Sequence, residues 1–445
     1  MSNFLSNNPL TRFIRNVVGP AAIMAAGMIG AGAVSTRLLA GAWFGFDLLW
    51  VALYVIPMVL FTLDSASRVG NITGRGMIDM IKTEIHPALA WFMLIPTSLL
   101  NIIVNMGQMS VMAEGIYGIS GMDIPEGGEA TTGLIIITVI LTVISLLIVL
   151  FGGFKRLVKV MTGLLFLILV CFIIVAIKGL TEWKTWIGLI GGLIPKLPAD
   201  VQVVGSDGVR RAFTQLMGIA GQALPASVFL SFGYFTSNAE YTAADIKASF
   251  KKNILNFVFL WGMFSVIVVV AGTTALHNFY IGANGGLHYS QIETVADAAR
   301  VLAPALPGFL QPITIQIFSL GLLVAGFTTL VSVAMLQAYF CLDIVGKNWK
   351  YTKDNKLFRW TFGLWIAVPA LLSPFWSLPA LIKAILAMAG NLILAPIAVL
   401  IIIYFINKKK YVSEFTAGTG RNIFLGITFV FSMVIVVYGV MKLFG

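Results

Sequence analysis

Charged side chains are scarce in this chain of 445 residues. Asp, Glu, Lys and Arg make up 11% of it, whereas a soluble globular domain carries about 25%. Hydrophobic residues make up 59%, and the mean hydropathy is +0.95. The shortage of charge excludes an ordinary soluble domain and indicates a protein that crosses a membrane several times.

Cysteine and histidine are rarer still. The two cysteines, Cys171 and Cys341, lie within apolar runs, so we expect small core residues rather than a disulfide or a metal pair. The three histidines fall in or beside expected loops, and their spacing is not that of a metal site. An enzyme is not expected, because no nucleophile, base and orienting group recur together in a motif.

Long apolar segments are what the sequence has in abundance. At about 20 apolar residues per crossing, it predicts an all-α integral membrane fold of about eleven helices in one polytopic domain, residues 1–445. The expected helices are centred near residues 30, 57, 103, 141, 168, 225, 264, 327, 367, 392 and 432.

Basic residues gather in alternate connections, for example Lys247, Lys251 and Lys252 in one and residues 408–410 in another. The positive-inside rule therefore predicts a cytoplasmic N-terminus and an external C-terminus, in the plasma (inner) membrane. The formal net charge of +11 then reflects topology and attraction to anionic lipid. No basic face with interleaved aromatics is present, so the expected partners are the lipid bilayer and a small-molecule substrate, not nucleic acid.

Two apolar segments are interrupted by small residues. The first break covers residues 27–37, and the second covers residues 218–227 and includes Pro225. Glycine and proline are commoner in membrane helices than in soluble ones, which would explain either break alone. Breaks in the first and sixth helices predict two inverted five-helix repeats, residues 16–180 and 210–405, with an extra eleventh helix at 420–445.

The first helix and its exit carry a recognisable set of residues: Gly19, Pro20, Gly27, Gly32, Thr36, Gly41, Phe44, Gly45, Leu48, Leu49 and Trp50. With this set the sequence resembles the NRAMP proton-coupled divalent-metal transporters. The likeness continues through residues 65–74, Pro225, Leu230 and residues 368–371, and it implies a LeuT-type fold of the APC superfamily with helices 1 and 6 broken.

The metal site that the resemblance implies is not retained. In the family's first-helix Asp-Pro-Gly-Asn motif, the two side-chain ligands fall on Gly30 and Ala33, and only Gly32 is kept. In the sixth-helix Met-Pro-His motif, the methionine falls on Leu224 and the histidine on Ala226. None of these four side chains can ligate a transition metal.

The acidic pair of the family's third helix is also replaced. On a looser alignment these proton-route positions fall on Asn105 and Gln108, which have similar shapes but do not titrate. The nearest acids, Asp47, Asp64 and Glu114, are interpreted as helix-end or rim residues rather than metal ligands. We therefore expect that proton coupling and transition-metal transport are lost.

The altered first break suits an anion. Small residues from Gly30 to Gly32 leave backbone amides accessible at the positive end of a half-helix. The pattern resembles the first-helix motif with which amino-acid transporters of the APC superfamily hold a carboxylate, although glycines also allow close helix packing. The predicted substrate-binding residues are Gly30, Ala31, Gly32, Ala33, Ser35, Gln222, Leu224, Ala226, Ser227, Phe229 and Asn391.

Three further polar residues have two interpretations each. Arg37 marks either a pathway or a side chain that snorkels outward. Thr328 and Thr329 resemble the hydroxyl pair of a sodium site in sodium-coupled LeuT-type transporters, but membrane threonines usually bond to their own backbone. No cofactor other than a sodium ion is expected.

Together these features predict an NRAMP-related secondary-active transporter that moves a small organic solute, an amino acid or similar carboxylate, by alternating access. One alternative is a transporter of Mg²⁺ or Mn²⁺ with a carbonyl-lined or hydrated-ion site, which needs fewer direct ligands. Another is a sensor that kept the fold without transport.

Overall fold

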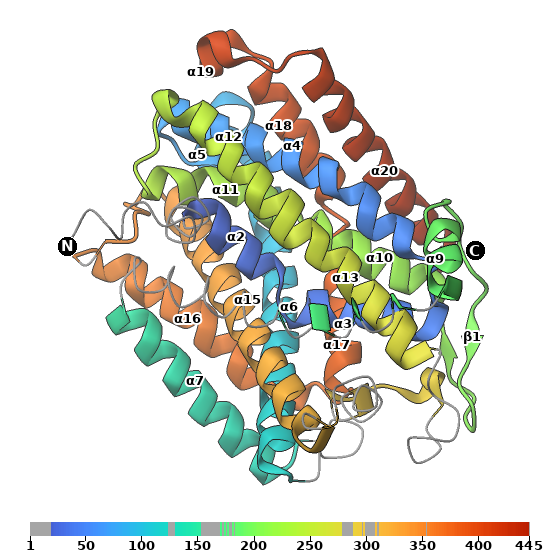
Figure 1. Ribbon diagram of the computed structural model, residues 1–445. Coiled ribbons are helices and arrows are strands. Elements are labelled where there is room, and N and C mark those ends of the chain that lie inside the picture. The colour runs from blue at the N-terminus through green and yellow to red at the C-terminus, as the bar shows by residue number, and fades with distance from the viewer. Residues whose placement is uncertain are drawn as a thin grey trace, which may run out of the picture.

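Long helices run from one end of the molecule to the other in the computed structural model (Figure 1). The structure describes residues 19–122, 130–152, 183–277, 288–295, 297–298, 311–352 and 354–444, with single positions at 170, 173–174, 176–177, 180–181 and 308. Within these residues, eight helices are long and apolar enough to cross a membrane, and two bent helix pairs raise the number to ten. Ten of the expected centres fall in these spans; the one near residue 168 lies outside the described residues.

The described helices of the first half are α2 (Pro20–Met28), α3 (Ala31–Phe44), α4 (Leu49–Thr73), α5 (Met77–Glu84), α6 (Pro87–Ser120), α7 (Thr132–Gly152) and α9 (Trp183–Gly191). Those that follow are α10 (Ala212–Ala223), α11 (Ala226–Asn238), α12 (Ile246–Asn253), α13 (Met263–Ala271), α15 (Thr314–Ile344), α16 (Lys356–Leu372), α17 (Ala380–Gly390), α18 (Ala395–Ile406), α19 (Lys409–Val412) and α20 (Thr419–Phe444). Two π-helical stretches, Ile254–Gly262 and Gly272–His277, flank α13 within one long span.

One small sheet interrupts the helical pattern of the described chain. Strand β1 (Val201–Gln202) pairs antiparallel with β2 (Val209–Arg210), and Val201 lies opposite Arg210. This hairpin lies in the connection between α9 and α10, and it was not predicted from the sequence.

The central helix α15 packs along α6, and these two organise the bundle. On one side α16 contacts both α15 and α7, while on the other side α4, α18 and α20 contact one another (Figure 1). Helix α4 also crosses α11 with almost no space between the backbones, since a Cβ built on Gly70 would lie 2.6 Å from the Cα of Gly233. A side chain at either glycine would separate α4 from α11.

Three spans are broken. Helices α2 and α3 form the first predicted break, with an angle of 48° between them. The second lies at Leu224 and Pro225, between α10 and α11, where proline supplies no amide donor for the helix ladder. A third, between α17 and α18 with an angle of 44°, was not predicted. The limits of the two repeats, residues 16–180 and 210–405, stay a prediction.

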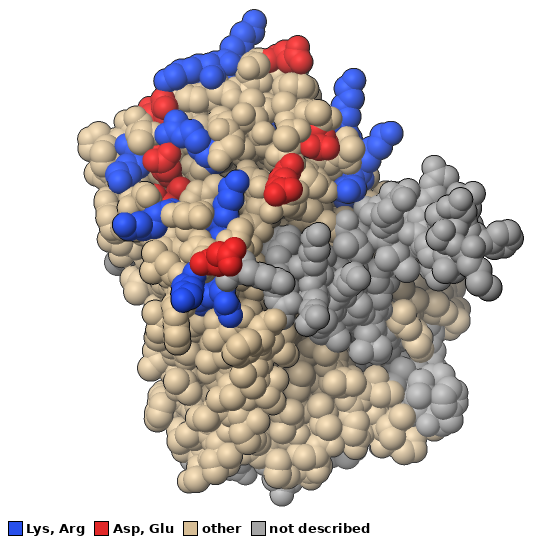
Figure 2. Space-filling model, turned by 90° about the vertical axis from the view of Figure 1, so that its left-hand side faces the viewer, with Lys and Arg blue, Asp and Glu red and all other residues tan. Residues whose placement is uncertain are grey.

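The outer surface is divided between apolar and charged regions. Large apolar side chains on α6 and α20, such as Phe92, Ile95, Val430 and Val434, are exposed as in a lipid-facing surface. Figure 2 shows Lys and Arg gathered with Asp and Glu over the upper part of one face, while the lower part is almost free of them. A protein that spans a bilayer is expected to have a charged end and an apolar surface around its middle, as this molecule has.

Candidate functional site

The first break places two helix ends together inside the bundle. Helix α2 ends at Met28, and α3 begins after Gly30, whose backbone is extended (φ −72°, ψ 177°). Glycine is needed here for space rather than for its dihedral angles, because a Cβ built on Gly30 would lie 1.5 Å from Oγ1 of Thr329 on α15. Helix α15 therefore packs directly against the break.

The carbonyl groups at the end of α2 have hydrogen-bond donors from two other helices. Thr329 Oγ1 on α15 donates to the carbonyl oxygen of Gly27 over 2.5 Å. Gln222 Nε2 on α10 donates to the carbonyl oxygen of Met28. Thr329 and Gln222 thus supply donors to carbonyl groups that the end of a helix leaves without intrahelical hydrogen bonds. The first and second breaks are thus linked through Gln222, whose Oε1 is buried with no hydrogen-bond partner.

The amino end of α3 faces α6. The amide of Gly32 donates to Gln108 Oε1 over 3.4 Å, while Gln108 Nε2 is buried without a partner. The hydroxyl groups of Ser35 and Thr36 donate to the carbonyl oxygens of residues 31 and 32 in their own helix, over 2.7 Å and 2.8 Å. At the predicted anion site the side-chain amide of Gln108 thus keeps a free donor, whereas the backbone amides of residues 32–34 and both hydroxyl hydrogens are already donated.

At the second break the predicted residues are closely packed, and apart from Gln222 and Ser227 they are apolar. Leu224 and Phe229 are fully buried, and Ala226 and Ser227 are nearly so. Asn391 lies at the third break, where its backbone N–H donates to the carbonyl oxygen of Met388 over 3.1 Å. The structure thus places the predicted residues at the three helix breaks.

Sequence reasoning missed Met388. A Cβ built on Gly32 would lie 2.7 Å from Met388 Cε, and one built on Gly221 would lie 2.1 Å from the Met388 carbonyl oxygen. Met388 therefore separates the first break from the glycine-rich end of α10. Its one sequence signal is its place just before Gly390 and Asn391, where α17 ends.

Two predicted pairs are separated by the structure. Asn105 Nδ2 donates to the carbonyl oxygen of Trp365 on α16 over 3.2 Å, whereas Gln108 contacts the first break. Thr328 donates to the carbonyl oxygen of Ala325 in its own helix over 2.9 Å, whereas Thr329 reaches α2. Only one member of each pair lies at the candidate site.

Arg37 does not snorkel to the surface, because its exposed fraction is 0%. Its Nη1 donates to the carbonyl oxygen of Ala33 over 3.3 Å, and its guanidinium carbon lies 5.4 Å from the ring centroid of Trp261. Its Nε and Nη2 atoms are buried without a hydrogen-bond partner. The structure thus favours the alternative in which this arginine marks a pathway or awaits a partner.

Carboxylates in the described chain are engaged elsewhere. Asp64 forms ion pairs with Arg68 and Arg421, both on the α4 side of the bundle. Glu114 accepts the amides of Ala380 and Val295 over 3.0 Å and 3.3 Å. No group of three or more His, Cys, Asp or Glu side chains lies close enough to hold a metal ion among the described residues.

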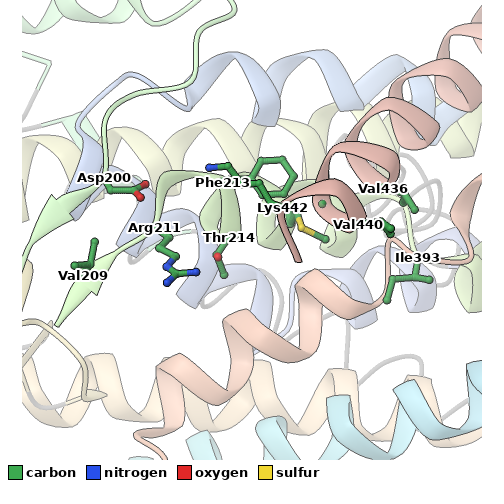
Figure 3. Close-up of a pocket in the computed structure, with 11 residues that line it drawn as sticks. Asp200, Val209, Arg211, Phe213, Thr214, Ile393, Val436, Val440 and Lys442 are labelled. Carbon is green, nitrogen blue, oxygen red and sulfur yellow. The ribbon is translucent and has the colours of Figure 1, made fainter. Parts of the chain in front are cut away.

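Among the described residues, one cavity lies at the edge of the third break and another lies away from the breaks. One of about 470 Å³ lies between the start of α10, the end of α20 and Ile393, with Arg211 and Lys442 among its lining residues (Figure 3). The other, of about 580 Å³, lies beside the end of α3 and α9, near the ion pair between Lys196 and Asp47. Neither cavity is lined by a predicted substrate-binding residue.

A family model described as natural resistance-associated macrophage protein-like, or Nramp, matches residues 21–442. The chain belongs to the Nramp family. It is therefore a membrane transporter and not an enzyme. The resemblance noted in the first helix extends over nearly the whole chain.

Curated relatives of this Nramp chain include the divalent metal cation transporter MntH of Yersinia pestis, 23% identical over 329 residues that cover 73% of this chain and 72% of the relative. MntH of Yersinia enterocolitica is 25% identical over 316 residues, covering 71% and 70%.

Solved structures show the same fold. A manganese transporter mutant of Eremococcus coleocola has a TM-score of 0.73 at 15% identity, covering 97% of this chain and 87% of that one. MhsT in complex with L-phenylalanine has a TM-score of 0.60 at 15% identity, covering 94% and 97%. The Nramp chain accordingly has a LeuT-type fold. At 15% identity these structures show a shared fold alone.

Proposed function

We propose that this Nramp-family transporter moves a small organic solute that carries a carboxylate, such as an amino acid, by alternating access around the first break. The observation that carries the proposal is the chemistry of the break. The family's ligand positions hold Gly30, Ala33, Leu224 and Ala226, while neutral amides of Gln108 and Gln222 face the two helix ends.

The free energy of ion transfer supports the loss of tight transition-metal binding. Moving an ion from water into a protein interior costs several kcal/mol, which charged or soft ligands must offset. Gly27 and Met28 offer carbonyl oxygens at the break, but each already accepts a hydrogen bond. Two such carbonyls compensate a divalent charge poorly, whereas the free Nε2 of Gln108 and the positive end of the α3 dipole suit the negative charge of a carboxylate.

Divalent-cation transport is the second candidate, because the curated relatives are named divalent metal cation transporters. A hydrated ion such as Mg²⁺ keeps several waters and needs few direct protein ligands. Carbonyl oxygens and the free Oε1 of Gln222 would then face the ion's water shell.

Thermal unfolding of the purified protein separates the two candidates. A ligand that binds only the folded state at a hundredfold excess over its Kd stabilises by about 2.7 kcal/mol. We expect a saturable rise in the unfolding midpoint with amino acids or other small carboxylates and none with Mn²⁺ or Mg²⁺. A rise with a divalent cation alone would refute the organic-solute proposal.

Two glycine variants locate the binding event in the same assay. Gly30→Ala places a Cβ against Thr329 and is expected to abolish the ligand-induced rise. Gly426→Ala is the matched control, because a Cβ built there on α20 meets no atom within 4 Å. An unchanged ligand response in Gly30→Ala would remove the first break as the site.

We also propose a sodium ion at the same break, coordinated by the carbonyl oxygen of Gly27 and the hydroxyl oxygen of Thr329. These two oxygens lie 2.5 Å apart where α2 meets α15, and each has further lone pairs. The proposed orientation is cytoplasmic for the N-terminus and external for the C-terminus, in the plasma (inner) membrane, which the charged end of the molecule supports.

A further inference from the structure

Arg37 is a permanent positive charge in the interior of the bundle. Its side chain is fully buried, and a guanidinium group does not lose its proton in proteins. One of its five N–H groups donates to Ala33, while Nε and Nη2 have no acceptor. The face of Trp261 offers a cation–π contact at 5.4 Å, which attracts the charge without accepting these hydrogen bonds.

No carboxylate of the described chain pairs with Arg37. The ion pairs among the described residues involve other basic side chains, at positions 68, 75, 196, 210, 410 and 421. The sequence contains no Asp or Glu from 151 to 181, which includes most of the undescribed residues between α7 and α9. Other undescribed acids fall at positions 123, 126, 129 and 182, next to the ends of α6, α7 and α9 in the sequence.

The unpaired guanidinium lies on the same half-helix as the predicted anion site. Its bond to the Ala33 carbonyl directs it back toward the first turn of α3, the 14-residue half-helix that begins after Gly30. The buried, unpaired Nε2 of Gln108 approaches the same turn, 3.1 Å from where a Cβ of Gly32 would lie. The side-chain amide of Gln108 and the guanidinium of Arg37 thus offer free donors around the first half of α3, and no described acid pairs with either.

We propose that Arg37 is the counter-charge for a cargo of net negative charge, a small monocarboxylate without an ammonium group. This inference rests on the proposed function and narrows its substrate class. The carboxylate is held by the first turn of α3 and Gln108 with the positive charge of Arg37 behind it. Gln222 Oε1 accepts a hydrogen bond from a neutral donor of the cargo, such as a hydroxyl. An ammonium group finds no carboxylate partner there.

The test compares the ligand affinities of the wild type, Arg37→Met and Arg37→Lys, measured in chloride-free sodium sulfate. The ligands are acetate, pyruvate, benzoate and L-lactate, with L-alanine as the zwitterion, L-lactamide as the neutral analogue of lactate, and chloride and Mn²⁺ as further probes. We expect at least one monocarboxylate to bind the wild type, and to bind Arg37→Met at least about 30-fold more weakly. Arg37→Lys retains the charge and is expected to recover part of the affinity.

Stability without ligand gives a second measurement. If the charge awaits a cargo, Arg37→Met removes an unpaired buried cation and raises the unfolding midpoint of the ligand-free protein. If the cation–π contact with Trp261 is the whole role, the same variant lowers that midpoint, and the proposal is overturned. A rise also shows that the variant folds.

The remaining outcomes separate this inference from the proposed function. Binding of L-alanine with equal affinity to the wild type and Arg37→Met overturns the role of Arg37 and leaves organic-solute transport intact. Arg37-dependent binding of chloride without any monocarboxylate overturns the cargo assignment. A response to Mn²⁺ alone overturns both proposals, and a wild type that binds no member of the carboxylate panel overturns this one.

Discussion

At the scale of single residues, two adjacent threonines have different surroundings. Thr328 donates within α15, whereas the hydroxyl of Thr329 reaches the Gly27 carbonyl of α2. A membrane-helix hydroxyl that bonds to its own backbone is the ordinary case, so Thr328 needs no further role. A hydroxyl that joins two helices at a break is a better candidate for binding an ion.

Thr329→Val is therefore expected to remove sodium dependence and Thr328→Val to retain it. Valine keeps the shape of threonine and removes the hydroxyl, and the Gly27 carbonyl left without its donor costs about 1–3 kcal/mol of stability. The measurement is the affinity for the stabilising solute in sodium and in choline. Equal behaviour of the two variants would contradict the assignment, and a wild type indifferent to sodium would dispose of the sodium site.

Sequence reasoning reached the residue types of the site but not their orientations. Asn105 and Gln108 are three residues apart on α6, yet one contacts α16 and the other the first break. The burial of Arg37 was equally undecided, because a long basic side chain near a helix break can turn either way. Such choices depend on the neighbouring helices, which the sequence of one helix does not specify.

At the scale of elements, a cluster of polar side chains joins α5 to α19. Glu84 accepts hydrogen bonds from Lys410 over 2.6 Å, from Arg75 over 3.0 Å and from Tyr411 over 3.0 Å. The bond from Lys410, followed by those from Arg75 and Tyr411, lowers the pKa of Glu84 to about 2. The cluster ties the short helix after α4 to the connection between α18 and α20.

Glu84→Gln should loosen this contact. The carboxylate is stabilised when charged, so its contribution is complete above its unfolded pKa of about 4.3 and is lost as the pH falls through about 2. We expect faster amide exchange in α5 and α19 for the variant at pH 7, and no pH dependence of this contact in the wild type between pH 6 and 8. Glu414→Gln, at an exposed site nearby, is the control. Identical exchange in both variants would show that Glu84 does not hold the two helices.

The positions of the helices and of the first two breaks were more accessible to sequence reasoning than the packing of the helices. Glycine runs and Pro225 marked the first two breaks, and the structure confirms both as ends of helices. The bend between α17 and α18 was missed, because Gly390 and Asn391 precede Pro396 by several residues and look like ordinary membrane-helix composition. The side chain that packs against the first break, Thr329, comes from α15, far away in the sequence.

At the scale of the whole molecule, charge separates one end from the rest (Figure 2). The exposed residue Lys347 follows α15 at an end of the spans where basic residues recur, and the exposed residue Ser206 lies in the hairpin between β1 and β2. Helix α15 is by itself long enough to carry the chain across a bilayer. The two positions thus report opposite sides of the membrane under the proposed orientation.

Single cysteines introduced as Lys347→Cys and Ser206→Cys, with Cys171 and Cys341 replaced by alanine, test that orientation. A membrane-impermeant maleimide should label the cysteine at 206 in intact cells, and the one at 347 only after permeabilisation. The reverse pattern would invert the assignment of sides.

The contact between Gly30 and Thr329 also limits which side chains position 30 can carry. The resemblance places the family's Asp ligand at position 30, yet a Cβ there would lie 1.5 Å from the Thr329 hydroxyl oxygen. A single Gly30→Asp substitution thus meets an occupied space, and it requires a change at position 329 as well. The two positions are sterically coupled: building a metal ligand into this break takes a paired substitution.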